Sequence, residues 1–142
     1  MADVPIYRRD FKVLADLRVE EAHVLLASGK QQGAYYLCGY AVECALKACI
    51  ARTMRLYRFP PKKEFVYKIY SHNLNALVNA AGLDVQLDAA INANQAFAAN
   101  WNTVKDWNED SRYKGSGLNG TDLYNAVTDA NNGVLPWIKT RW

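Results

Sequence analysis

The sequence predicts an all-α protein, an up-and-down four-helix bundle that forms a single domain over residues 1–142. Apolar residues recur at helical spacing almost throughout the chain, and capping residues, glycines or prolines separate the periodic segments. Hydrophobic residues make up 51% and charged residues 22% of the 142, which is typical of a globular domain with its own core.

The first two helices follow from this periodicity. A single apolar stripe runs from Tyr7 to Ala27 and predicts the first helix, after which Gly29 and Gly33 bracket a short connection. The second helix is expected from about Gln32 to Leu56. Phe59-Pro60-Pro61 ends it, because proline cannot continue a helix and restricts the residue before it.

The middle of the chain predicts two shorter elements. Phe65 to Tyr70 would suit a strand, but no partner strand is found elsewhere, so we expect a loop or a short helical turn. A third helix is expected from His72 to Ala81, with Ser71 as its N-cap and Gly82 at its end.

The rest of the chain predicts two longer helices. Asp84 is expected to cap a fourth helix that continues to about Asp106. Asn108 to Gly120 is rich in polar residues and glycine, which favours a loop. Thr121 is expected to cap the last helix, in which Gly133 and Pro136 predict a kink.

The second predicted helix has little polar surface. Its first face carries Ala34, Leu37, Cys38, Ala41, Val42, Ala45, Ala48 and Cys49. Its opposite face carries Tyr36, Tyr40, Leu46 and Ile50, interrupted by Glu43 and Lys47. A helix that is apolar nearly all round is buried on both sides. In a chain this short, a second copy is the simplest cover, so we expect a homodimer.

Glu43 and Lys47 stand at i, i+4, the order that favours an ion pair. A carboxylate among apolar neighbours needs a cation or a hydroxyl, and Arg18 on the first helix is a candidate partner. Two interpretations stay open: a structural ion pair, or charges on the floor of a cleft between two subunits.

Gly115-Ser-Gly117-Leu-Asn-Gly120 matches the pattern GxGxxG, but without a preceding strand it does not indicate a dinucleotide fold. Arg112 and Lys114 precede the helix that begins near Thr121. This loop is either an anion site, with free amides and two cations, or a flexible surface segment. Trp107 and Tyr113 beside it are candidates to stack on a base.

Other chemistry is not expected. The three cysteines, Cys38, Cys44 and Cys49, match no zinc spacing and suit a core. The two histidines, His23 and His72, are expected to be structural, so we expect neither a metal site nor a cofactor. The dense cations from Arg52 to Lys68 suit either phosphates or a solvated loop. With no apolar run of about 18 residues and no signal peptide, we expect a cytoplasmic protein without membrane contact.

Three segments give the chain its resemblance to the HEPN superfamily. The first runs from Ala34-Tyr-Tyr-Leu through Ala41-Val-Glu43-Cys-Ala-Leu-Lys47-Ala and is similar to the family's A-Y-x-A-x-x-A-V-E-x-x-L-K-A helix. The second is Ser71-His72-Asn73-Leu74, and the third is Ser111-Arg112-Tyr113. The resemblance implies a four-helix bundle, usually a homodimer, active in RNA cleavage, in toxin–antitoxin pairs with a minimal nucleotidyltransferase, or in defence.

Catalytic members of that family carry an arginine followed, after four to six residues, by a histidine. Arg112 matches the arginine, but positions 117–119 are Gly, Leu and Asn, and no histidine follows His72. Arginine stays protonated and Tyr113 has a reference pKa near 10, so neither replaces the base.

We therefore expect a non-catalytic HEPN-type module that binds a nucleotide, RNA or another phosphate ligand through Arg112, Tyr113, Lys114, Glu43 and Lys47. It would belong to a toxin–antitoxin-like or defence pair, with a nucleotidyltransferase-type protein as partner. Two alternatives stay open. One is a divergent HEPN ribonuclease that uses Arg112, and the other is a protein-binding adaptor that uses the second face of the buried helix.

Overall fold

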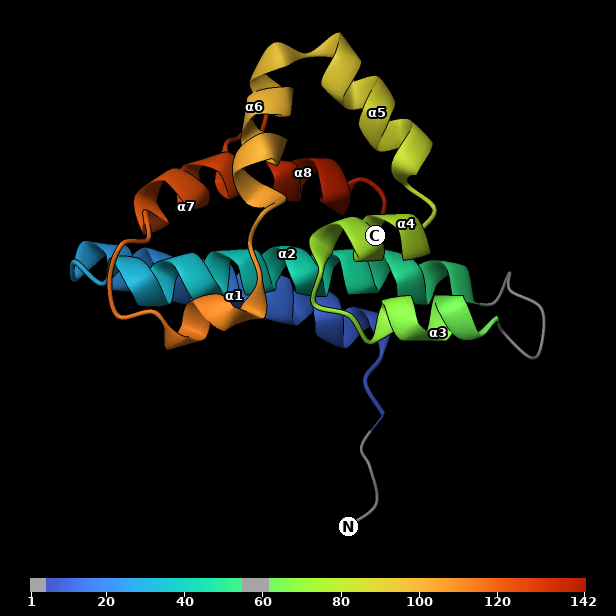
Figure 1. Ribbon diagram of the computed structural model, residues 1–142, viewed down its shortest axis with the longest axis horizontal. Helices are drawn as coiled ribbons and strands as arrows, with labels where there is room; N and C mark the ends of the chain where they lie inside the picture. Colours follow the sequence, from blue (N-terminus) through green and yellow to red (C-terminus); the bar gives the residue numbers. More distant parts are fainter. Residues whose placement is uncertain (1–4, 55–61) are drawn as a thin grey trace.

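The computed structural model describes residues 5–54 and 62–142, and every regular element in these ranges is helical, which confirms the all-α class (Figure 1). The elements are α1 (Arg8–Ala27), α2 (Gln31–Thr53), α3 (Lys63–Ile69), α4 (Leu74–Ala80), α5 (Asp84–Ala93), α6 (Gln95–Val104), the 3-10 helix η2 (Glu109–Tyr113), α7 (Gly120–Thr128) and α8 (Val134–Lys139). None of the described helices is long and apolar enough to cross a membrane.

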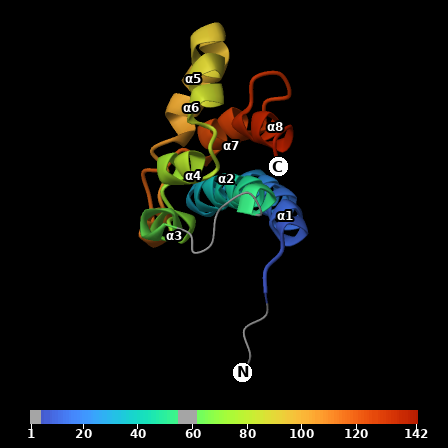
Figure 2. The same cartoon turned by 90° about the vertical axis from the view of Figure 1, so that its right-hand side faces the viewer.

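Helix α2 lies at the centre and contacts α1, α4, η2, α7 and α8. Figure 1 shows α1 along one side of α2 and α7 and α8 above it, while α5 and α6 form a bent arm at the top. In the view turned by 90°, α7 and α8 lie between this arm and α1 (Figure 2). The core therefore forms around α2, as its apolar sequence predicts.

The chain covers part of the second face of α2 by itself. Glu43, Leu46 and Ile50 lie on that face and are almost fully buried within a single subunit. Helix α4 packs along its C-terminal part, while η2 and Trp107 pack along its N-terminal part. Segments far along the sequence thus return to part of the face that a second copy was expected to bury, whereas Tyr36, Tyr40 and Lys47 stay half-buried, and the homodimer remains a prediction.

The expected long fourth helix is broken in two at Asn94. This residue has extended backbone angles (φ −146°, ψ 107°), and its side chain accepts hydrogen bonds from the amides of Ala96 and Phe97 at 3.0 and 3.1 Å. An asparagine that caps the next turn competes with the helical hydrogen bonds of the turn before it. The chain therefore turns, and α5 and α6 become separate helices.

The expected last helix is also broken in two. Asp129 ends α7, where its carboxylate accepts hydrogen bonds from the amides of Asn131 and Asn132 at 3.3 and 2.7 Å. Gly133 has extended backbone angles and serves as the N-cap of α8. Pro136 lies in the first turn of α8, where its missing N–H costs little. The expected kink is thus a complete break that precedes the proline.

Several predicted helix starts move by one or two residues. The N-cap of α4 is Asn73, which accepts from the amide of Ala76 at 3.0 Å, and not Ser71. Helix α5 has Leu83 as its N-cap, so Asp84 is the first helical residue. The N-cap of α7 is Asn119 instead of Thr121, because the side-chain oxygen of Asn119 accepts from the amide of Asp122 at 2.9 Å.

The short middle helices and the loop before α7 complete the comparison with the expected boundaries. Residues 65–70 are mostly helical, within α3, and Gly82 closes α4 with a positive φ of 71°, as predicted. The expected loop from Asn108 to Gly120 contains η2. The predicted end of the second helix at Leu56 and the Phe59-Pro60-Pro61 stop lie outside the described residues.

Candidate functional site

Four polar or aromatic residues of α2, at spacings of four, three and four, share one face of the helix: Tyr36, Tyr40, Glu43 and Lys47. We call these four residues the tyrosine face. The rings of Tyr36 and Tyr40 are stacked, with centroids 6.0 Å apart and an interplanar angle of 21°. They form the aromatic half of the face, and Glu43 and Lys47 form its charged half.

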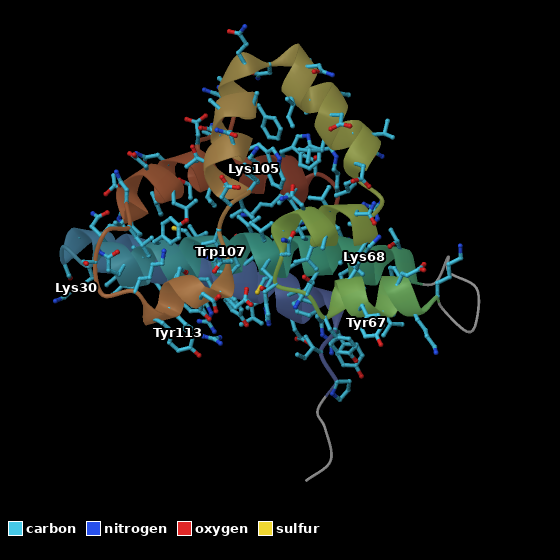
Figure 3. All side chains as sticks on the ribbon, in the orientation of Figure 1. Lys30, Tyr67, Lys68, Lys105, Trp107 and Tyr113 are labelled. Atoms are coloured by element: carbon cyan, nitrogen blue, oxygen red, sulfur yellow. The ribbon has the colours of Figure 1, made fainter. Side chains whose placement is uncertain are left out.

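Trp107 anchors the aromatic half from outside α2. Its indole lies 6.1 Å from the ring of Tyr36 and is 2% exposed (Figure 3). Gly39 makes room for it, because a Cβ at this position would lie 2.2 Å from three indole atoms. The expectation that Trp107 stacks on a base was wrong, since the ring already packs on α2.

Arg112 and Tyr113 project from η2 into solvent beside this aromatic half. The guanidinium of Arg112 lies 4.8 Å from the ring centroid of Tyr113, which is 75% exposed (Figure 3). Hydrogen bonds to the hydroxyls of Tyr113 and then Tyr36 raise the pKa of Arg112 above its ordinary value. Arg112 is therefore a permanent cation at the N-terminal end of the tyrosine face.

The interior of η2 supports this position. The side chain of Asn108 accepts from the amide of Asp110 at 3.0 Å and begins the turn. Ser111 is buried between the two exposed residues, and its hydroxyl has no hydrogen-bond partner in the described part of the chain. Ser111 thus faces the interior, whereas Arg112 and Lys114 are exposed to solvent.

Glu43 is the buried centre of the charged half, at 2% exposure. Its Oε1 lies 2.7 Å from Nδ1 of His72, and its Oε2 lies 3.5 Å from Nζ of Lys47. Two donors thus meet a carboxylate that would otherwise be buried without compensation. The i, i+4 pair is present as predicted, and His72 is a partner that the sequence analysis missed.

His72 reaches Glu43 from the turn between α3 and α4. The hydroxyl of Ser71 accepts from the amide of Asn73 at 2.9 Å and holds this turn beside α2. The His72 side chain remains 45% exposed. A neutral ring that donates from Nδ1 to Glu43 carries its lone pair on Nε2, so the carboxylate sets the tautomer.

The predicted partner, Arg18, does not bind Glu43. Its Nη1 lies 2.7 and 2.8 Å from the two carboxylate oxygens of Glu21, one turn further along α1. The guanidinium also lies 5.8 Å from the ring centroid of Tyr40. Arg18 therefore borders the tyrosine face with its charge already compensated.

Burial raises the pKa of Tyr40, and the nearby Cys44 and Glu43 raise it further. Its hydroxyl therefore stays protonated and can donate a hydrogen bond. Burial also raises the pKa of Cys38 and Cys44 to about 12 and that of Cys49 to about 11, which excludes thiolate chemistry near neutral pH. The described residues contain no group of three or more histidine, cysteine or acidic side chains that could hold a metal ion.

At the GxGxxG loop and the start of α7, side chains bind several of the amides that the predicted anion site would use. Gln32 accepts from the amide of Leu118 at 2.8 Å, and Gln31 accepts from the amide of Thr121 at 2.9 Å. The amide of Asp122 is bound to Asn119, and the carboxylate of Asp122 lies in the first turn of α7. Side chains already satisfy these three amides, and the carboxylate of Asp122 adds a negative charge at the start of α7.

The predicted site residues therefore gather at two ends of one helical face. Arg112 and Tyr113 adjoin Tyr36, and Glu43 and Lys47 adjoin His72. Lys114 follows η2 and is exposed. Comparison of the chain with protein-family models, with curated proteins and with solved structures finds no match.

Proposed function

We propose that the protein is a non-catalytic HEPN-type helical module whose tyrosine face binds a phosphate-bearing ligand, a nucleotide or RNA. The observation that carries the proposal is the exposed pair on η2, in which the guanidinium of Arg112 lies 4.8 Å from the ring centroid of Tyr113. A permanent cation beside an exposed ring pairs with a phosphate while the ring stacks on a base.

The charges favour this end of the face over the other. Among the described residues, Arg112 forms no salt bridge, whereas Lys47 is paired with Glu43 and Arg18 with Glu21. The phosphate therefore belongs at Arg112, with Lys114 as the second exposed cation on the same segment. Glu43 would repel an anion at the other end, so Glu43 and Lys47 act as supports of the face.

The remaining parts of this proposal are the up-and-down four-helix bundle, a homodimer, a toxin–antitoxin-like or defence pair with a nucleotidyltransferase-type partner, and a cytoplasmic location. A different surface from the one expected now supports the homodimer. Val13, Leu17 and Val24 form an exposed apolar stripe along α1, and such a stripe is typical of a contact surface. Sedimentation as a monomer would count against the dimer.

Isothermal titration with ATP and with a 12-nucleotide RNA at low salt tests the binding proposal. Wild-type protein should bind, and Arg112→Gln should weaken binding about tenfold or more, in line with one lost charged hydrogen bond. Lys30→Gln is a control, because Lys30 is an exposed lysine of the α1–α2 connection (Figure 3). No binding by wild-type protein would refute the proposal.

A divergent ribonuclease is the second candidate, and the 2.7 Å contact between His72 and Glu43 favours it. A histidine oriented by a carboxylate can take the proton of a 2′-hydroxyl through Nε2. The 2′-oxygen then forms a bond to phosphorus, and the bond from phosphorus to the 5′-oxygen breaks as that oxygen takes a proton from water. The products are a 2′,3′-cyclic phosphate and a 5′-hydroxyl.

The separation of Arg112 and His72 along α2 makes the ribonuclease the less favoured candidate. Tyr36 and Glu43, which hold Arg112 and His72, are seven residues apart, about 10 Å along an α-helix. That separation suits two neighbouring groups of a bound strand better than one reacting phosphate. Incubation of RNA with wild type, His72→Ala and Arg112→Ala is the test. Cyclic-phosphate products from wild type alone would establish the enzyme, and intact RNA would exclude it.

A further inference from the structure

A second cluster of positive charge lies where α1 begins and α2 ends. A hollow of about 530 Å³ is lined there by four cations, Arg8, Arg9, Lys12 and Arg52. Arg141 joins them, because Nη1 of Arg52 donates to its carbonyl oxygen at 3.2 Å. We call Arg8, Arg9, Lys12, Arg52 and Arg141 the basic end.

Hydrogen bonds hold part of the basic end in place. Arg8 donates to a main-chain oxygen of Trp142, and Nη1 of Arg141 donates to the carbonyl oxygen of Trp137 at 2.9 Å. Nε of Arg8 is buried without a hydrogen-bond partner in the described part of the chain. Main-chain oxygens thus position the guanidinium groups of Arg8, Arg52 and Arg141, and no acidic side chain is paired with them in the described ranges.

In the described part of the chain, no acidic side chain neutralises this cluster. Within residues 5–54 and 62–142, none of its five cations takes part in a salt bridge. Of the acids on α1, Asp10 accepts from the amide of Tyr7 at 2.8 Å, and Asp16 is paired with Lys139. The formal net charge of the chain is only +3, so five cations in one place without acidic side-chain partners mark an uneven charge distribution.

Aromatic rings lie among these cations. The guanidinium of Arg9 lies 4.9 Å from the ring centroid of Tyr7, which is 52% exposed. Nζ of Lys12 lies 5.4 Å from the ring centroid of Trp142. Exposed rings between cations are what single-stranded nucleic acids require, because bases stack on the rings while the cations follow the backbone.

We propose that the basic end binds single-stranded nucleic acid, through its phosphodiester backbone and with a base stacked on Tyr7. The site is separate from the tyrosine face and does not depend on it. Tyr36 and Arg52 are sixteen residues apart on α2, about 24 Å along the helix, so one mononucleotide cannot occupy both. A strand of several nucleotides is the ligand class that fits cations drawn from both ends of the chain.

Salt dependence of binding gives a quantitative test. Each phosphate contact with a single strand contributes about −0.7 to the slope of log K against log salt. Five contacts give a slope of about −3.5, and Arg9→Gln/Lys12→Gln should reduce its magnitude by about 1.4. If the two proteins bind equally at 1 M salt, this difference becomes roughly 25-fold weaker binding of the variant at 0.1 M.

Fluorescence anisotropy measures both the affinity and its salt slope. The probes are a fluorescein-labelled 20-nucleotide single-stranded RNA and DNA of the same sequence, titrated at 50 to 200 mM KCl. Arg9 and Lys12 are suitable because their side chains make no hydrogen bond within the described ranges, so the fold should persist. Lys30→Gln/Lys105→Gln removes the same charge elsewhere and should change the affinity less than twofold (Figure 3).

The outcomes separate this proposal from the binding of ATP at the tyrosine face. Loss of nucleic-acid affinity in Arg9→Gln/Lys12→Gln, with the titration by ATP unchanged, supports two sites. An unchanged salt slope, or an equal loss in the control pair, overturns the proposal. Binding to phosphatidylglycerol vesicles without binding to RNA or DNA also overturns it, because the basic end would then be a membrane surface.

Discussion

Substitution of Gly39 by alanine tests the packing on which the tyrosine face depends. The added Cβ would lie 2.2 Å from three atoms of the Trp107 indole, well inside any permitted contact. Overpacking of a core costs about 1–3 kcal/mol, and loss of a buried tryptophan costs about 3–5 kcal/mol. Alanine recovers about 1 kcal/mol of helix propensity. We therefore expect Gly39→Ala to lower the free energy of unfolding by about 2 kcal/mol.

A matched control is available in the same helix. Gly33 is exposed, and a Cβ there would meet Cδ1 of Leu25 at 3.1 Å, which is the mobile end of a side chain. Gly33→Ala should therefore leave stability unchanged or raise it by up to about 1 kcal/mol. Urea denaturation followed by circular dichroism measures both variants. For a chain of this length, the loss in Gly39→Ala corresponds to a Tm decrease of roughly 6–8 °C.

A double variant shows whether the indole is the cause. In a Trp107→Ala background the obstacle is gone, so Gly39→Ala should become neutral or stabilising. Equal stability of wild type and Gly39→Ala would refute the placement of Trp107 on α2. So would a loss in Gly39→Ala that persists unchanged without the indole. In either case η2 and Arg112 would no longer be located beside Tyr36.

Two further predictions concern titratable groups. His72→Ala should lower the free energy of unfolding by about 1 kcal/mol, because Glu43 loses its 2.7 Å partner. Chemical denaturation measures this loss, and His23→Ala, which removes an exposed ring beside Tyr124, should change it by less than about 0.5 kcal/mol. The buried thiols with pKa values of about 11 to 12 keep their protons in the folded state, while unfolded thiols lose them near pH 8.5–9. Stability should therefore fall as the pH rises from about 9 to 11, and Cys38→Ala should flatten this dependence.

The strongest periodic segments were predicted well from sequence. The bounds of α1 differ from the prediction by one residue, and α2 starts one residue early, because long amphipathic or apolar patterns dominate local alternatives. The breaks at Asn94 and Asp129 were missed. Apolar residues keep helical spacing across Asn94, so the pattern does not reveal that this side chain caps a new turn.

The sequence predicts that Glu43 needs hydrogen-bond donors, but it does not predict which residues supply them. A carboxylate at position 43 on an apolar helix requires donors, and this followed from the sequence. The identity of the second donor depends on where the turn before α4 meets α2, twenty-nine residues later. Arg18 was the wrong candidate because Glu21 lies one turn away on its own helix, and local pairs form first.

Trp107 had a signal in the sequence that was not used. Gly39 lies in the interior of the second helix, on the side of Tyr36 and Tyr40. A glycine there costs about 1 kcal/mol of helix propensity unless something packs closely against the backbone. Four tryptophans were available as the large partner, so the contact could be expected even though its position along the chain could not.

The positions of the paired and unpaired cations along α2 indicate the length of the ligand that both proposed sites can bind. Glu43 holds Lys47 and His72, and Glu21 holds Arg18, so the middle of α2 offers an anion little net attraction. Free cations remain at Arg112 and at the basic end, about 24 Å apart along α2. A compact nucleotide gains from only one of them, whereas an extended strand gains from both through effective concentration. The spacing of the free charges therefore favours RNA over a mononucleotide as the ligand that binds most tightly.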